Sequence, residues 1–382
     1  MSELSYLEKL LDGVKVEWKT LEKVLKRTKG TKITAGQMKA LHKDNAPLKI
    51  FAGGKTVAFV DFKDIPEKDI NREPSIIVKS RGIIEFEYYD KPFSHKNEMW
   101  SYHSNNDAIS IKYIYYFLKI NEGYFQKIGG KMQMPQIATP DTDKFEVPIP
   151  CPDNPEKSLA IQSEIVRILD KFTALTAELT AELNMRKKQY NYYRDQLLNL
   201  EGRENTREMR IGDIYDFQYG TGNTIPKSGG QYPVYGSNGI VGSHDKYNSE
   251  DSPVIGHIGA YAGIVNWGQG KHFVTYNGVI CRHKSKEVLQ KYAYYLLLLQ
   301  DFGSKSNSAS QPFVSYNILN APIVLVPPLQ EQARIVAILD KFDTLTNSIT
   351  EGLPREIELR QKQYEYYRDL LFSFPKSETV SN

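Results

Sequence analysis

Two blocks of residues each occur twice in this sequence, and this internal repeat constrains the fold more than any other feature. Residues 162–172 read Gln-x-x-Ile-Val-x-Ile-Leu-Asp-Lys-Phe and return as residues 332–342, at an offset of 170. Residues 188–195 read Lys-Gln-Tyr-x-Tyr-Tyr-Arg-Asp and return as residues 362–369, at an offset of 174. The offsets differ by four residues, about one helical turn, so the second copy carries an additional turn between its blocks.

Both copies have the apolar periodicity of long α-helices. Spacings of four and three alternate from Ile161 to Leu175, the heptad pattern of a helix that packs on another helix. We expect the two helices to bury these stripes against each other; the alternative is that each packs on its own neighbouring domain. The residues predicted to form the seam are Ile165, Ile168, Phe172, Leu175, Tyr190, Ile335, Ile338, Phe342, Leu345 and Tyr364. In the second copy, Gly352-Leu-Pro354 predicts a kink, or a break with Pro354 opening a new helix.

A four-residue unit is repeated inside the first helix. Thr176-Ala-Glu-Leu179 is followed directly by Thr180-Ala-Glu-Leu183. Each unit adds about one turn while barely rotating the apolar stripe, a stutter that locally unwinds a coiled coil. This tract predicts a spacer whose length is the property that matters.

The segments before the helices also correspond. Residues 112–118 (Lys-Tyr-Ile-Tyr-Tyr-Phe-Leu) resemble residues 291–297 (Lys-Tyr-Ala-Tyr-Tyr-Leu-Leu), and residues 6–11 resemble residues 193–198. The order of the chain is therefore cyclic: helix end, globule, helix, globule, helix. It predicts a pseudo-twofold molecule with two heads joined by two long antiparallel coiled-coil helices.

Each head has the pattern of an α/β or α+β domain with many loops. Short β-type runs occur at residues 75–78 and 82–89 in the first head and at 232–241, 253–256 and 273–276 in the second. Asn238-Gly239 is a strong tight-turn signal. A helix is expected at each Lys-Tyr-x-Tyr-Tyr block.

The overall composition is that of a globular cytoplasmic protein with two domains. The 382 residues are 40% hydrophobic and 25% charged, and the net charge of +3 means that any nucleic-acid surface must be local. Cys151 and Cys281 are too few for a disulfide framework or the usual zinc site, and we expect both to be inert. The longest strongly apolar run, residues 294–299, is far below a membrane span.

Loops rich in Ser, Asn, Gly, Lys and Tyr interrupt both heads. Residues 23–32 alone hold five positive charges. Amides and hydroxyls can read base edges, while Lys and Arg pair with phosphates, although each loop taken singly also fits a solvated turn. The candidate DNA-binding residues are Lys26, Arg27, Lys29, Lys32, Lys55, Lys79, Arg81, Lys131, Gln133, Thr221, Asn223, Thr224, Lys227, Ser237, Asn238, Tyr261, Lys305, Asn307, Ser310 and Gln311.

Signals for catalysis fail when their spacing is tested. Gly53-Gly-Lys-Thr56 lacks the earlier glycine of a phosphate-binding loop, and the glycines from Gly256 to Gly263 are wrongly spaced for a dinucleotide site. Residues 140–144 superficially resemble a nuclease signature but are expected to be a polar turn, and no Asn- or Asp-Pro-Pro-aromatic motif occurs. His244, His257 and His272 are expected to be ordinary loop residues. We predict no catalytic residues, no metal site and no cofactor in this chain.

The repeated helical blocks and the Thr-Ala-Glu-Leu tract resemble the specificity subunits of type I restriction-modification systems, the IC class in particular. Residues 14–150 and 207–326 would then be two target recognition domains, and 156–203 and 328–375 the conserved helices. Residues 1–13 would complete the helical region, with 376–382 a tail. The resemblance implies that each domain reads one half of a split, asymmetric DNA target, the first domain the 5′ half.

The same resemblance implies partners. Two methyltransferase subunits would dock on the helices and carry S-adenosylmethionine, and restriction subunits with ATP and Mg²⁺ would join them. The number of Thr-Ala-Glu-Leu units would be associated with the spacer length, with Thr176, Leu179, Thr180 and Leu183 marking the tract. The alternatives are a coiled-coil scaffold with two protein-binding heads and a self-contained DNA methyltransferase.

Overall fold

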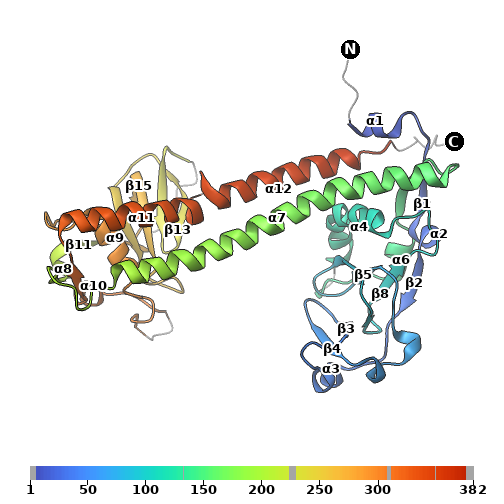
Figure 1. Cartoon of the computed structure of the whole chain (residues 1–382), viewed down its shortest axis with the longest axis horizontal. Coiled ribbons are helices and arrows are strands. Elements are labelled where there is room, and N and C mark those ends of the chain that lie inside the picture. The colour runs from blue at the N-terminus through green and yellow to red at the C-terminus, as the bar shows by residue number, and fades with distance from the viewer. Residues whose placement is uncertain (1–5, 132, 223–228, 308–310, 349, 376–382) are drawn as a thin grey trace, which may run out of the picture. The chain divides into compact units, whose positions relative to one another are not determined.

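The computed structural model describes residues 6–131, 133–222, 229–307, 311–348 and 350–375 (Figure 1). The chain divides into two compact units. Unit 1 comprises residues 1–178 and 357–382, and unit 2 comprises residues 179–356. Because unit 1 is assembled from segments on both sides of unit 2 in the sequence, the structure has the cyclic order that the repeated blocks predict.

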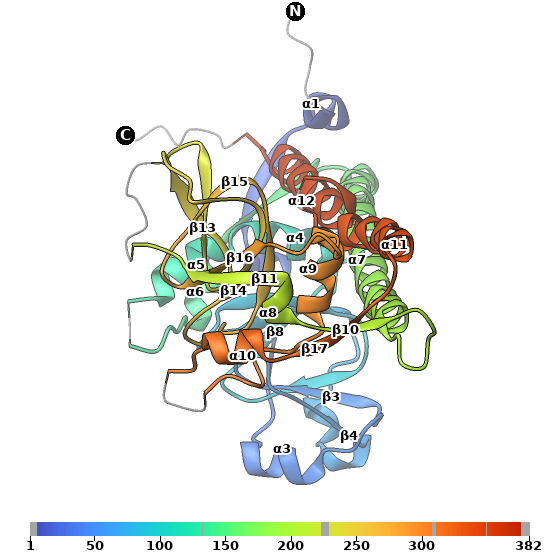
Figure 2. The same ribbon diagram turned by 90° about the vertical axis from the view of Figure 1, so that its left-hand side faces the viewer.

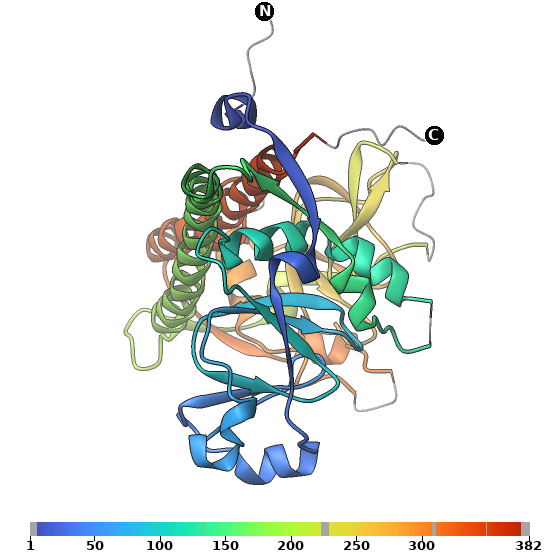
Figure 3. The same cartoon turned by 90° about the vertical axis from the view of Figure 1, so that its right-hand side faces the viewer.

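The described strands of unit 1 form a four-stranded sheet, a three-stranded sheet and a two-stranded pair (Figure 3). The four-stranded sheet is antiparallel, in the order β2 (Lys26–Lys29), β8 (Trp100–His103), β5 (Ser75–Lys79), β6 (Glu85–Tyr89). The three-stranded sheet has the order β4 (Val57–Val60), β3 (Leu48–Phe51), β7 (Phe93–His95), with β3 and β7 parallel. The remaining pair joins β1 (Val16–Thr20) to β9 (Glu146–Pro150).

The helices of unit 1 cover this framework and close its core. The short ones are α1 (Tyr6–Leu11), α2 (Leu21–Val24), α3 (Ala35–Leu41), α5 (Glu122–Gly129), α6 (Thr139–Asp143) and the 3₁₀ turns η1 (Phe62–Asp64) and η2 (Glu67–Asp69). The predicted helix at the Lys-Tyr-x-Tyr-Tyr block is confirmed as α4 (Ile111–Ile120), which begins where the Ser110 side chain accepts a hydrogen bond from Tyr113 N. Its buried Tyr113, Ile114 and Leu118 pack in one cluster with β5 and β8.

Unit 2 has one larger sheet in place of the two in unit 1 (Figure 2). Its order is β11 (Tyr215–Tyr219), β16 (Gly278–His283), β14 (Ser249–Gly256), β15 (Val265–Val274), β12 (Tyr232–Gly236), β13 (Gly239–His244). β10 (Arg207–Arg210) pairs separately with β17 (Ile323–Val326). The ten-residue β15 pairs with β14 along its first part and, in parallel, with β12 at its end. In unit 1, the segment Asp90-Lys-Pro92 divides the same path into β6 and β7, because proline cannot continue a central strand.

Three helices of the unit 2 head correspond, by their places in the order of elements, to α2, α4 and α6 of unit 1. They are α8 (Ile211–Ile214), α9 (Gln290–Leu298) at the second Lys-Tyr-x-Tyr-Tyr block, and α10 (Tyr316–Asn320). Tyr292, Tyr295 and Leu297 of α9 are buried in a cluster with β16, β17 and α11. Both units are thus mixed α/β domains, as predicted.

A single helix of 44 residues, α7 (Pro155–Leu198), contributes to both units (Figure 1). Its length of about 66 Å follows from a rise of 1.5 Å per residue. The second helical copy is broken into α11 (Leu329–Asn347) and α12 (Gly352–Leu371). Gly352 has φ +80°, and an added Cβ would meet the carbonyl oxygen of Thr344 at 2.4 Å, so the turn before Pro354 requires glycine. The predicted interruption is therefore a break, with Pro354 in the first turn of α12.

The long helices pack both on their own heads and on each other. Ile165 and Ile335 are fully buried in the cores of units 1 and 2 respectively. Phe172, by contrast, contacts Tyr364 of α12, and Tyr190 contacts Phe342 of α11. Ile168, Ile338 and Leu345 are half-buried and Leu175 is exposed. The predicted seam residues thus divide between two kinds of contact.

Candidate nucleic-acid interface

The two heads place a Gly-Thr step at the same point of the fold. β2 ends at Lys29, opposite Trp100 of β8, and β11 ends at Tyr219, opposite Val279 of β16. Thr31 N donates to His95 O at 2.8 Å, and Thr221 N donates to Val274 O at 3.1 Å.

The preceding glycines are required by close packing. A Cβ on Gly30 would lie 2.3 Å from His95 O, and one on Gly220 would lie 2.2 Å from Thr275 O. These two loops therefore correspond although their side chains differ.

A β-hairpin projects next to each Gly-Thr loop. In unit 1 it is β3–β4, held by a hydrogen bond from Lys96 N to Phe51 O at 2.9 Å. In unit 2 it is β12–β13, held by the corresponding bond from Thr275 N to Tyr235 O at 3.0 Å. The first hairpin turns through Gly53-Gly54-Lys55 and the second through Ser237-Asn238. Candidate contacts from the two heads thus occupy equivalent tips.

A third loop also corresponds between the heads. Gly82 N donates to Pro135 O at 2.9 Å in unit 1, and Gly259 N donates to Pro312 O at 2.8 Å in unit 2. This pairing places Arg81 beside the segment that holds Gln133 and Met134, and its Nε donates to Met134 Sδ at 3.2 Å. In unit 2 the same pairing brings residues 258–262 to residues 311–313.

The loops of unit 2 converge around a small cavity at the hairpin tip. Its volume is about 280 Å³, and Ser237, Asn238 and Tyr261 contribute to its lining together with Thr275 and Asn277. The Ser237 hydroxyl shares its single proton between Ile258 O, at 3.0 Å, and Asn277 O, at 3.1 Å, which links the tip to both neighbouring loops. Asn238 and Tyr261 remain exposed. A fixed loop with exposed amide and phenol groups has the properties needed to read base edges.

An aromatic stack supports the same face of unit 2 and was not predicted. The Tyr219 ring lies between the rings of His257, at a centroid distance of 4.1 Å, and Tyr316, at 4.2 Å. Tyr219 N also donates to the Tyr316 hydroxyl at 2.9 Å. The only sequence signal for Tyr219 is its place directly before the Gly-Thr step. The stack therefore joins the end of β11 to the loop after β14 and to the start of α10.

Most of the lysines and arginines among the candidate DNA contacts lie in unit 1. Lys26 and Lys29 lie on the edge strand β2 and are exposed, as are Lys32, Lys55 and Lys131. Arg27 Nε pairs with Asp143 at 3.3 Å. An exposed lysine on an edge strand can reach a phosphate without first breaking an internal bond.

Lys79 does not fit the predicted phosphate contact. Only 6% of it is exposed, and its Nζ lies 2.6 Å from Glu85 Oε1 and 2.8 Å from Glu87 Oε2. Burial lowers the pKa of Lys79, but the hydrogen bonds to these carboxylates outweigh burial and hold the pKa above its ordinary value. The Lys79 charge is therefore paired with carboxylates inside unit 1 and does not face solvent.

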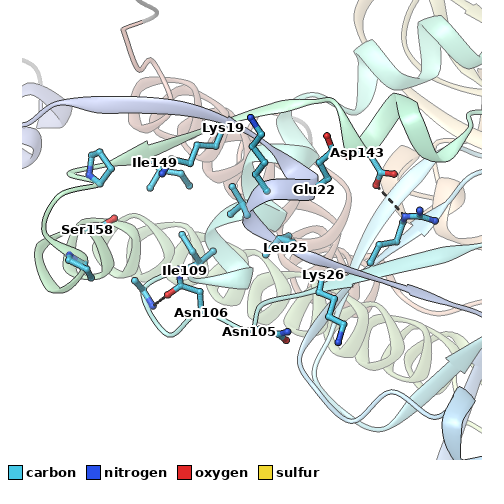
Figure 4. A pocket seen from close by; sticks show the side chains of 16 residues that line it. Lys19, Glu22, Leu25, Lys26, Asn105, Asn106, Ile109, Asp143, Ile149 and Ser158 are labelled. Atoms are coloured by element: carbon cyan, nitrogen blue, oxygen red, sulfur yellow. Dashed lines mark hydrogen bonds and ion pairs between the residues drawn. The ribbon is translucent and has the colours of Figure 1, made fainter.

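A larger basic pocket lies beside the start of α7 (Figure 4). It has a volume of about 680 Å³, and its lining includes Lys19, Lys23, Lys26, Asn105 and Ser158. Figure 4 places Lys19, Lys26 and Asn105 around this opening, with the ion pair of Asp143 at one side. The pocket adds cationic surface next to the β2 edge.

The remaining candidate contacts occupy other exposed loops or fall outside the described residues. Lys305, Asn307 and Gln311 are exposed, and Asn307 N donates to Phe313 O at 3.2 Å. Asn223, Thr224, Lys227 and Ser310 lie outside the described residues.

Several expectations about isolated residues were wrong. His272 was expected in a loop but lies buried within β15, whereas His257 does occupy a loop, directly after β14, and is buried there. His244 ends β13. Residues 140–143 belong to the short helix α6 rather than a simple turn, and Thr142 and Asp143 accept hydrogen bonds there from Trp100 and Tyr102.

The two cysteines are free, and the described helices do not resemble membrane spans. Cys281 is buried, which raises the pKa of its thiol well above the ordinary value, and Cys151 is half-buried. Within the described ranges, every helix is too short or too polar to cross a lipid bilayer.

Comparison with known proteins identifies the family. The family described as "Type I restriction modification DNA specificity domain" matches residues 15–186 and 203–359. The specificity subunit of the type I restriction enzyme EcoR124I/EcoR124II from Escherichia coli is 40% identical over 420 aligned residues, covering 100% of both chains. The EcoprrI specificity subunit, also from Escherichia coli, is 37% identical over 383 residues, covering 92% of this chain and 93% of the relative.

The fold is also similar to that of a solved structure. A crystal structure of the type I restriction-modification S subunit from M. genitalium matches with a TM-score of 0.68 and 18% identity, covering 96% of this chain and 98% of that one. The two family matches lie in the two halves that the internal repeat relates. The chain therefore belongs to the specificity subunits of type I restriction-modification systems.

Proposed function

We propose that this chain reads a DNA target in two separate parts, with the loop face of each unit contacting one part. The observation that carries the proposal is the matched pair of loop sets, which share backbone hydrogen bonds and differ in their side chains. The same framework with Gly53-Gly54-Lys55 in one head and Ser237-Asn238 in the other suits two readers with unlike specificities. By family analogy, unit 1 takes the 5′ half and unit 2 the 3′ half.

The side chains of the two faces suit different kinds of DNA contact, phosphate contacts in unit 1 and base contacts in unit 2. Lys29 and Lys32 in unit 1 would pair with phosphates and fix the register, because such contacts are electrostatic and independent of sequence. Asn238 in unit 2 would hydrogen-bond a base edge, for which adenine is the usual partner of an asparagine amide.

The continuous helix α7 would set the number of unread base pairs between the half-sites. The Thr-Ala-Glu-Leu units lie inside α7, and the boundary between the two units falls after Glu178, within this tract. Removing one unit shortens the helix by about 6 Å, against about 3.4 Å per base pair of DNA. A change of one unit should therefore change the spacer by a step of base-pair size.

The long helices would also dock the methyltransferase subunits, through which restriction subunits would join. Tyr192 and Tyr366 occupy corresponding places in the repeat and are 61% and 65% exposed. Exposed aromatic rings on a helix are the kind of side chain that interfaces favour. The partners would supply S-adenosylmethionine, ATP and Mg²⁺.

Methylation mapping in a host that carries this chain and its methyltransferase tests the proposal. We expect one split sequence to be modified, and we expect deletion of residues 180–183 to shorten its spacer while both half-sites stay the same. An active deletion variant with the original spacer would remove the ruler role of α7. A gel shift separates the protein-scaffold alternative, since a scaffold would leave DNA unshifted with or without the methyltransferase.

A further inference from the structure

A carboxylate on α7 ties the long helix to the head of unit 1. Asp170, the aspartate of the repeated Ile-Leu-Asp-Lys-Phe block, accepts a hydrogen bond from the Tyr116 hydroxyl at 2.5 Å. Its other oxygen accepts from Lys112 Nζ at 2.7 Å. Lys112 and Tyr116 both belong to α4, so one side chain of the long helix holds two side chains of the head.

Unit 2 repeats this contact between head and long helix, which we call a joint, with the corresponding residues. The Tyr295 hydroxyl of α9 donates to Asp340 Oδ1 of α11 at 2.5 Å. Lys291 Nζ lies 3.9 Å from the same oxygen and 4.0 Å from the centre of the Trp267 ring. Burial raises the pKa of Tyr295, and the bond to Asp340 raises it further, so the hydroxyl remains a donor at any physiological pH.

The chemistry of these contacts accounts for the recurrence of the same Asp, Lys and Tyr residues in both copies, while the rest of the two heads differs in sequence. A hydrogen bond to a charged group is directional and stronger than one between neutral groups. The packing of Ile165 and Ile335 supplies area but little directional constraint. The Tyr–Asp bonds therefore add a directional constraint on the angle at which each head meets its helix.

We propose that Asp170 and Asp340, with Tyr116 and Tyr295, are positioning residues that determine how strictly the protein discriminates spacer length. This inference rests on the proposed reading of a split target. For a domain of about 120 residues, with a diameter of about 34 Å, a tilt of about 5° about the joint moves the opposite face by about 3 Å. That displacement is close to one base pair. A looser joint would thus let a head reach a half-site placed one base pair away.

The test compares Tyr295→Phe with a matched control on the same helix. Tyr292 is also buried, but its hydroxyl has no hydrogen-bond partner among the described residues, so Tyr292→Phe makes the same chemical change without cutting a joint. Each chain is assembled with its methyltransferase. Methylation rates are then measured on duplexes carrying the natural spacer or a spacer one base pair longer or shorter.

We expect Tyr295→Phe to lower the ratio of natural-spacer to altered-spacer rates about three- to tenfold, with the preferred bases of both half-sites unchanged. Tyr292→Phe should keep the wild-type ratio. A ratio for Tyr295→Phe within twofold of wild type would overturn the inference. A loss of rate that is equal on all duplexes would also overturn it, because a purely structural role predicts that result.

A second variant provides the test in unit 1, and the wild-type complex tests the proposed function separately. Tyr116→Phe removes one of the two bonds to Asp170 in unit 1, while the bond from Lys112 remains. It should loosen spacer discrimination in the same direction, so it decides the matter if Tyr295→Phe does not fold. The proposed function fails separately, if the wild-type complex methylates no split sequence at all.

Discussion

The ring of Phe172 stacks on the ring of Tyr367 at a centroid distance of 5.5 Å and an interplanar angle of 25°, and Phe342 and Tyr193 repeat this contact at 5.6 Å and 28°. Phe172 and Phe342 come from one repeated block, and Tyr193 and Tyr367 come from the other. The repeat in the sequence thus becomes a repeated helix–helix contact, once inside each unit.

The Phe342–Tyr193 contact predicts a measurable coupling. In a double-mutant cycle on unfolding free energy, Phe342→Leu and Tyr193→Leu should couple by about 0.5–1.5 kcal/mol. The lower end is expected because Tyr193 is 45% exposed. Denaturant titration of the two single variants and the double variant gives the value. Additive losses would mean that the rings touch without stabilising the helix pair.

Gln332 predicts a large stability effect from one amide. It is fully buried, its Oε1 accepts from Leu289 N at 2.7 Å, and its Nε2 donates to Glu287 O at 3.0 Å and Pro327 O at 2.8 Å. Gln332→Leu leaves these buried backbone groups unpaired and should cost about 3 kcal/mol. Chemical denaturation measures the loss.

A matched control for that experiment lies on α7. Gln196 is exposed, so Gln196→Leu should change the unfolding free energy by no more than about 0.5 kcal/mol. Equal effects of the two substitutions would contradict the assigned role of the Gln332 amide.

The equivalent hairpin tips predict that each half-site responds to its own head. Asn238→Ala should relax the base preference in one half of the target by about 5- to 150-fold, and Lys55→Ala should act on the other half or on overall affinity. Methylation of a duplex library randomised in both half-sites provides the readout. If Asn238→Ala altered both halves equally, the assignment of one head to each half would be wrong.

Burial of His95 predicts acid sensitivity in unit 1. Its Nδ1 lies 3.1 Å from Lys96 O and its Nε2 lies 3.1 Å from Ser101 Oγ, and burial lowers the pKa of His95 below the ordinary 6.5. Below pH 6.5 the unfolded chain therefore binds the proton that the folded chain excludes. The stabilisation from neutral His95 is complete above pH 6.5 and is lost as pH falls towards the folded pKa.

His95→Gln should flatten this pH dependence. The amide can satisfy both partners without titrating, so the fall in Tm between about pH 7 and pH 5 should be smaller than in wild type. Some dependence should remain, because burial also lowers the pKa values of His272 and His283 in unit 2. An unchanged slope in the Tm of unit 1 would contradict a buried neutral His95.

The sequence was most informative where side chains repeat. Periodicity and the repeated blocks predicted α7, the break before α12 and the cyclic order, since these depend on apolar spacing and on glycine and proline. Asp170 and Asp340 were visible in the sequence as members of a repeated block. Their partners in α4 and α9, however, lie 45–58 residues away in sequence, and only the fold brings them together.

The candidate interface was harder to predict because its two halves are related through the backbone. The bonds from Gly82 N to Pro135 O and from Gly259 N to Pro312 O involve no side-chain atom, so the letters around them can diverge freely. Residue type alone could not distinguish exposed Lys29 from buried Lys79, and it gave no indication of the partners that stack on Tyr219.

The division of unit 1 across the sequence affects how this protein is made. Unit 2 is contiguous in sequence, so all of it is present once residues 179–356 have left the ribosome, whereas the unit 1 core includes Leu371, Phe372 and Phe374, which pack against segments synthesised long before. Trp18 Nε1 even donates to Pro375 O at 3.1 Å. The half of the protein that is translated first is therefore the last to be completed, and a nascent chain stalled before residue 371 would expose an open apolar core to chaperones and proteases.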